Sequence, residues 1–133
     1  MIKKLLSARL AGNLLLILFG LLIGFHLLVL FNLLPEDIVW GGRAASGPAQ
    51  ARTLELVSLV LTVLFAGVVS AKIGYIEAGK WGRVVNIALW VIFAYLVLNT
   101  LGNLVAISSL EKLIFTPLTL LAALLVLRLA LER

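Results

Sequence analysis

The chain has 133 residues, of which 63% are hydrophobic and only 13% are charged, and its formal net charge is +5. Together with a mean hydropathy of +1.20, this composition excludes an ordinary soluble domain and predicts one membrane-embedded domain over residues 1–133. The absence of cysteine excludes disulfides, thiol catalysis and thiolate metal sites. Because there is also only one histidine, we expect no metal and no cofactor.

Four runs without a formal charge predict four membrane-spanning helices. They cover residues 10–35, 56–71, 84–110 and 113–127 and contain 26, 16, 27 and 15 residues. A hydrocarbon core about 30 Å thick needs roughly 20 helical residues, so the first and third runs are long enough by themselves. The second and fourth cross only if flanking charged residues enter the membrane boundary. We expect the long side chains of Lys72 and Arg128 to do this by extending to the headgroups.

The first two helices are bounded by prolines. The first is predicted over about residues 10–34, because Pro35 cannot continue it with a normal hydrogen bond. Its apolar run is longer than the roughly 7–15 residues of a secretory signal, which favours an uncleaved helix. Residues 35–47 form the outer loop. Pro48 suits the first turn of the second helix, predicted over 48–73.

The last two helices are predicted over residues 83–106 and 109–131. Ser108 and Glu111 have the spacing of a capping box at the start of the fourth helix. Pro117 falls about two turns inside that helix, where it removes one backbone donor, so we expect a bend there. The predicted fold class is therefore an all-α, four-transmembrane-helix bundle.

The basic residues predict the orientation of this bundle. If both the N-terminus and the C-terminus are cytoplasmic, eight of the eleven Lys and Arg residues lie inside and three outside, as the positive-inside rule requires. The outer three are Arg43, Arg52 and Lys112. Because the basic residues are divided among helix ends, they favour this explanation over nucleic-acid binding. We predict a multi-pass protein of a bacterial cytoplasmic membrane.

Polar side chains gather toward the predicted outer ends of the helices. Glu55 heads a small or polar stripe on the second helix, and His26 lies near the outer end of the first. Burying such groups costs several kcal/mol unless they find partners. We therefore predict one outward-opening polar cavity. The candidate ligand-binding residues are His26, Trp40, Arg43, Glu55, Ser58, Tyr95, Asn99, Asn103 and Thr116.

Each candidate has a structural alternative. The amide and hydroxyl residues Asn99, Asn103, Thr116 and Thr119 also serve as hydrogen-bonding links between helices. His26 is either a neutral core histidine or a proton-exchanging partner of Glu55, in which case the two titrate as a pair. Trp40 and Arg43 either form a lid over the cavity or are an interface anchor and a solvated loop charge.

Three classes of function are compatible with these features. The first is binding or transport of a small molecule or ion in the cavity. The second is an enzyme acting on a lipophilic substrate through a Glu/His acid–base pair, although no catalytic motif is recognisable. The third is an accessory subunit that docks a larger complex, or another copy of the chain, through Gly20 and Gly24.

Three segments carry a resemblance to known proteins. IVWGGR at 38–43, LNTLGN at 98–103 and FTPLT at 115–119 resemble segments of a group of small four-helix bacterial membrane proteins. The resemblance covers nearly the full length of the chain and implies the same four-helix topology. It implies no activity, because none is established for that group.

Overall fold

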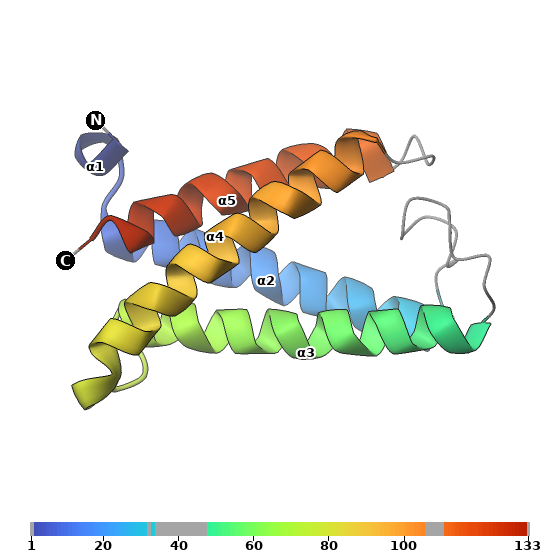
Figure 1. Ribbon diagram of the computed structural model, residues 1–133, viewed down its shortest axis with the longest axis horizontal. Helices are drawn as coiled ribbons and strands as arrows, with labels where there is room; N and C mark the ends of the chain where they lie inside the picture. Colours follow the sequence, from blue (N-terminus) through green and yellow to red (C-terminus); the bar gives the residue numbers. More distant parts are fainter. Residues whose placement is uncertain (1, 32, 34–47, 106–110, 133) are drawn as a thin grey trace.

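The computed structural model describes residues 2–31, 33, 48–105 and 111–132 (Figure 1). The side chains described are those of these residues except 2, 3, 48–51 and 111. The predicted outer loop at 35–47, with Trp40 and Arg43, lies outside the described residues, as does the capping residue Ser108.

The described residues form α-helices and short helical turns, with no strand among them. The helices are α1 (Ile2–Leu5), α2 (Ala8–Leu30), α3 (Pro48–Lys72), α4 (Gly82–Leu104) and α5 (Thr116–Ala130). A 3₁₀ turn, η3 (Gly79–Trp81), precedes α4, and a π-helical turn, η4 (Glu111–Phe115), precedes α5. Four segments are long and apolar enough to cross a membrane, namely Ala8–Leu30, Arg52–Lys72, Gly79–Leu104 and Lys112–Ala130. This confirms the predicted all-α architecture with four candidate spans.

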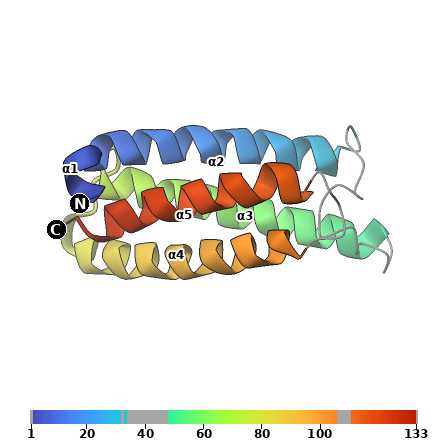
Figure 2. The ribbon, with the colours of Figure 1, turned by 90° about the horizontal axis from the view of Figure 1, so that it is seen from above.

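The four long helices pack as two pairs, α2 with α3 and α4 with α5, and α5 also packs on α2. Figures 1 and 2 show both chain termini at one end of the bundle. At the other end, α4 and α5 lie together, apart from the ends of α2 and α3 (Figure 1). The core lies between the pairs and is most closely packed in the half that holds the termini. Its fully buried members include Leu15, Val69, Leu89, Val126 and Leu129.

Large apolar side chains also cover the outer surface of the bundle. Leu21, Leu98 and Leu113 are each more than 60% exposed. A helix that is apolar on all sides is unfavourable in water but suits a bundle surrounded by lipid tails. The outward faces therefore agree with the membrane location that the composition predicts.

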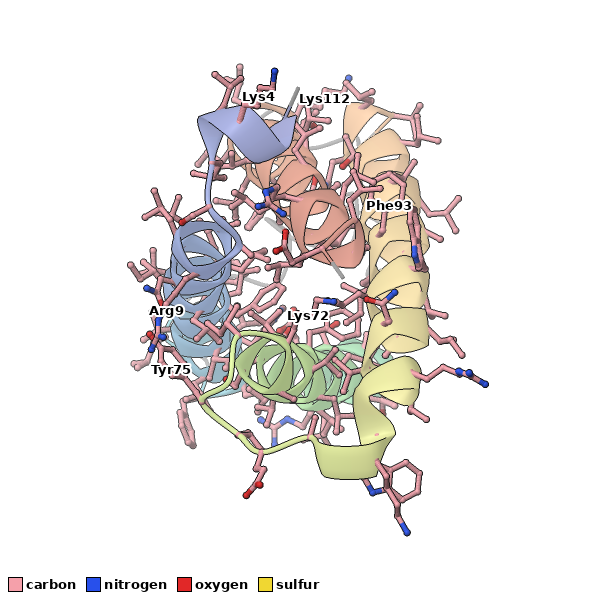
Figure 3. All side chains as sticks on the ribbon, turned by 90° about the vertical axis from the view of Figure 1, so that its left-hand side faces the viewer. Lys4, Arg9, Lys72, Tyr75, Phe93 and Lys112 are labelled. Atoms are coloured by element: carbon pink, nitrogen blue, oxygen red, sulfur yellow. The ribbon has the colours of Figure 1, made fainter. Side chains whose placement is uncertain are left out.

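The two predicted headgroup contacts, both at the end that holds the termini, are wrong. Arg128 is only 4% exposed, and its Nε donates to the Leu6 carbonyl at 2.6 Å while its guanidinium also pairs with Glu132 at 2.7 Å. Lys72 donates to Asn86 Oδ1 at 2.8 Å and to the Glu132 carbonyl at 2.6 Å, and Figure 3 shows it near the centre of the bundle. Both cations turn into the bundle because acceptors there satisfy them.

The fourth span also differs from its prediction. The expected helix with Pro117 two turns inside is a π-helical turn, η4, followed by an α-helix that begins at Thr116. Pro117 therefore stands in the first turn of α5, where a missing N–H leaves no intrahelical bond unmade. The irregularity that the proline was expected to introduce lies in the turn before it.

Candidate functional site

His26 and Glu55 meet between α2 and α3. His26 is in the last turns of α2, and Glu55 is near the start of α3, so the antiparallel packing of these helices brings the two to one depth. His26 Nδ1 lies 2.6 Å from Glu55 Oε2. The side chains are 14% and 2% exposed. The expected contact between them is therefore present. It is a short hydrogen bond between two ionisable side chains.

The pair faces a cavity of about 150 Å³. All four long helices contribute to its lining, together with Phe115 from η4. The polar lining residues are His26, Glu55, Ser58, Thr62, Tyr95, Asn99, Asn103 and Thr119. Among these, Tyr95 is 37% exposed, whereas Glu55 is 1% exposed. Six of the candidate residues predicted from the sequence line the cavity. They are the candidates that lie on α2, α3 and α4.

On the side of α4 and α5, two polar residues of the cavity, Asn103 and Thr119, are bonded to each other. The Thr119 hydroxyl donates to the Phe115 carbonyl at 2.8 Å and accepts from Thr100 at 2.9 Å and from Asn103 Nδ2 at 3.4 Å. These bonds join α4 to α5. Asn103 therefore both links helices and lines the cavity, so the two alternatives for this residue are compatible.

Aromatic rings form much of the remaining wall. Phe25 packs against His26 with ring centroids 5.8 Å apart, and against Phe115 at 5.2 Å. Phe65 packs against Tyr95 at 5.4 Å and against Phe19 at 6.1 Å. All six of these residues, including His26, line the cavity. The pair of ionisable groups is therefore set among aromatic side chains contributed by each helix pair.

Not every predicted residue belongs to the cavity. Thr116 is absent from its lining, and the Thr116 hydroxyl is buried without a hydrogen-bond partner among the described residues. Trp40 and Arg43 lie outside the described residues. A Cβ added at Gly20 or at Gly24 would meet no atom within 4 Å. Docking of another subunit through that glycine face therefore stays a prediction.

The aromatic walls were not expected from the sequence, and Thr119 was expected only to link helices. Phe25, Phe65 and Phe115 have no sequence feature that separates them from lipid-facing or core phenylalanines. For Phe25, its place beside His26 in the chain is the one available signal. Among the described residues, no group of three His, Asp or Glu side chains could hold a metal ion. Comparisons with family models, with curated proteins and with solved structures found no match for the chain.

Proposed function

We propose that this chain is a small multi-pass protein of the bacterial cytoplasmic membrane that binds a small molecule in the cavity around His26 and Glu55. The observation that carries the proposal is the 2.6 Å contact between these side chains at the wall of that cavity. An ionisable pair within a membrane helix bundle has a desolvation cost that an apolar pair avoids. A ligand that uses the pair accounts for its presence.

Binding is favoured over permeation by the packing beneath the cavity. Toward the end that holds the termini, Leu15, Val69, Leu89 and Val126 are each 0% exposed. Among the described residues, charged side chains reappear inside the bundle only beyond this apolar layer, around Lys72 and Arg128. A polar ligand in the cavity therefore meets a closed layer, and passage would require the two helix pairs to separate there.

The proposal is tested with Glu55→Gln, which keeps the shape of the side chain and removes its charge. Thermal unfolding of the purified protein is followed with and without choline, benzyltrimethylammonium, benzoate and benzyl alcohol across about pH 5–8, the range in which histidine changes charge. A ligand that binds only the folded state raises the unfolding midpoint. We expect at least one probe to do so with a pH dependence that Glu55→Gln abolishes.

Glu77→Gln is the matched control, because Glu77 is an exposed carboxylate between α3 and η3. It should respond to the probes as the unchanged protein does. Both variants should remain monodisperse in size-exclusion chromatography. The proposal is wrong if no probe stabilises the unchanged protein, or if Glu55→Gln responds to the probes with the same affinity and the same pH dependence.

A further inference from the structure

The lining of the cavity changes in character along the axis of the bundle. Nearer the chain termini, α2, α3 and α4 contribute five apolar residues, which form the apolar end of the cavity: Phe19, Leu22, Leu61, Phe65 and Leu96. Farther from the termini, the same helices contribute the polar end: His26, Glu55, Ser58, Asn99 and Asn103. At a rise of 1.5 Å per residue, Phe19 and His26 are about 10 Å apart along α2, and Glu55 and Phe65 are about 15 Å apart along α3. The two ends therefore lie at different depths in the membrane.

Two polar lining residues lie in or beside the apolar end. The Thr62 hydroxyl donates to the Ser58 carbonyl of its own helix at 2.7 Å, so its hydrogen is already used. Tyr95 packs its ring against Phe65 with centroids 5.4 Å apart. It comes one residue before Leu96, so it stands at the boundary between the two ends. The apolar end therefore has few groups that could bond to a polar part of a ligand.

The polar end offers neutral hydrogen-bonding groups. Asn99 is half-buried at the cavity wall, and its side-chain amide has no hydrogen-bond partner among the described residues. Asn103 donates through Nδ2 to Thr119 at 3.4 Å. A side-chain amide has both donors and an acceptor, so Asn99 can bond to a hydroxyl in either direction. Phe25 and Phe115 lie at the same depth and pack against each other at 5.2 Å, so this end also has an apolar side.

The size of the cavity limits the ligand to a small molecule. A space of about 150 Å³ holds a molecule about the size of a benzene ring. Small-molecule sites are largely apolar, with a few polar groups that fix the orientation of the ligand. Removing a charged ligand from water costs far more than removing a hydroxyl that finds a partner. The cavity therefore favours an uncharged ligand with its polar group at one end.

We infer that the cavity binds a small uncharged amphipathic alcohol, with its hydroxyl at the polar end and its apolar body at the apolar end. The inference rests on the proposed function and names the class of ligand and its orientation. Both follow from where the polar and apolar side chains lie, whatever the charge of His26 and Glu55. The hydroxyl bonds to Asn99, and the body of the ligand replaces water against the apolar end.

The first test uses two isomers and the unchanged chain in detergent. Binding of 1,2-benzenedimethanol is compared with that of 1,4-benzenedimethanol by equilibrium dialysis, with protein-free micelles as the blank for partition. The first isomer has both hydroxyls at one end of the molecule, and the second has one at each end. We expect the 1,2 isomer to bind at least about tenfold more tightly, because the 1,4 isomer places a hydroxyl at the apolar end without a partner.

A second pair of isomers is the control for shape. 1,2-Diethylbenzene and 1,4-diethylbenzene have nearly the shapes of the two alcohols, with a methyl group in place of each hydroxyl. Their affinities should differ by less than about threefold, because neither has a polar group that could be left unpaired.

A variant then assigns the polar end. Asn99→Leu keeps the approximate size of the side chain and removes the amide, so we expect it to weaken binding of 1,2-benzenedimethanol at least about fivefold. It should change the affinity for 1,2-diethylbenzene by less than about twofold. Thr116→Val is the matched control, because the Thr116 hydroxyl is buried near this end but does not line the cavity. It should bind both alcohols as the unchanged chain does.

The outcomes separate this inference from the proposed function. If the two alcohols bind equally, or if the diethylbenzenes show the same preference, the inferred orientation is wrong but the binding cavity stands. If neither alcohol binds while choline or benzoate does so in a manner that depends on Glu55, the class of ligand is wrong and the cavity again stands. If neither the alcohols nor any other probe binds, both are wrong.

Unchanged affinity of Asn99→Leu for 1,2-benzenedimethanol would also overturn the inference, because the hydroxyls would then bind elsewhere. The isomer comparison needs no variant, so it remains decisive if a substitution prevents assembly.

Discussion

Arg128 joins parts of the bundle that are far apart in the chain, because it contacts the Leu6 carbonyl and the Glu132 carboxylate. We expect Arg128→Met to lower the free energy of unfolding by about 1–3 kcal/mol, since it removes the buried donor to the Leu6 carbonyl and the ion pair with Glu132. Thermal unfolding in detergent measures the change. Arg83→Met is the control, because Arg83 is exposed and its loss should change stability by less than about 0.5 kcal/mol. Equal effects would show that the buried contacts of Arg128 contribute nothing.

His26 and Arg128 also show what a sequence can predict about single residues. The meeting of His26 with Glu55 follows from depth, because two polar groups at one level of a membrane bundle have few other partners. Arg128 is near the end of its helix, where a long cation can either reach the headgroups or turn inward. It turns toward Leu6, whose acceptor is a backbone carbonyl. Every residue has a backbone carbonyl, so the residue type does not indicate which carbonyl accepts the bond. This contact could therefore not be predicted.

The junction of η4 with α5 depends on Pro117. In a continuous α-helix, the N–H of residue 117 would bond to the Leu113 carbonyl, and proline has no N–H to donate. We expect Pro117→Ala to supply this donor, to convert the π-helical turn into α-helix and to displace Phe115 from the cavity wall. The affinity for a cavity probe such as benzyl alcohol should fall several-fold, while the unfolding midpoint changes little.

Pro48→Ala, in the first turn of α3, is the control for the loss of a proline as such. Backbone amide chemical shifts of residues 111–117 report the change of helix type, and equilibrium dialysis reports the affinity. If Pro117→Ala reduces stability and affinity together, the proline acts in folding and has no separate effect on the cavity.

The junction also lies where depth alone was used to place residues. Thr116 was expected at the cavity because it is polar and early in a fourth helix predicted from residue 109 onward, and Phe115 was not expected there. A π-helical turn adds a residue to one turn and changes which side chains share a face. Thr119, one turn into the regular part of α5, lines the cavity, whereas Thr116 does not. Periodicity cannot locate such a turn in advance.

α2 closely approaches the turn that follows α3, where Gly12 faces Ile73. A Cβ added at Gly12 would lie 2.5 Å from Ile73 Cγ2 and 2.8 Å from its Cδ1, so the isoleucine or the helices must shift. We expect Gly12→Ala to destabilise the protein by about 1–3 kcal/mol. Gly20→Ala is the control on the same helix, because its Cβ would meet nothing within 4 Å, and it should be neutral or slightly stabilising. The thermal unfolding midpoints of both variants are measured in detergent. Equal midpoints would contradict the close approach.

The whole molecule is tied together differently at its two ends. At the end that holds the termini, Lys72 of α3 bonds to Asn86 of α4 and to the chain near its C-terminus. At the other end, the α2–α3 pair and the α4–α5 pair separate (Figure 1), and the cavity lies between them. The four helices could be predicted from charge-free runs. The joining of the pairs at one end could not, because it depends on contacts between residues distant in sequence.

The distribution of basic residues predicts which side of the membrane the cavity faces. Because the bundle has four candidate spans and both termini at one end, the charge bias predicts that this end is cytoplasmic and that the cavity lies in the outer half. The chain has no cysteine, so single cysteines can be placed at Ser46 and Glu77. Glu77 is chosen instead of the nearby Gly79, because the φ of +55° at Gly79 disfavours any side chain. Replacing Glu77 also removes no basic residue.

We expect an impermeant maleimide to label Ser46→Cys in intact cells and to leave Glu77→Cys unlabelled, whereas both should react after the cells are permeabilised. The unchanged chain, which should not react under either condition, is the control. If only Glu77→Cys reacts in intact cells, the termini are outside and the cavity faces the cytoplasm. The ligand proposed for the cavity would then be taken from the cytoplasmic half of the membrane, so this experiment also decides the side from which that ligand is drawn.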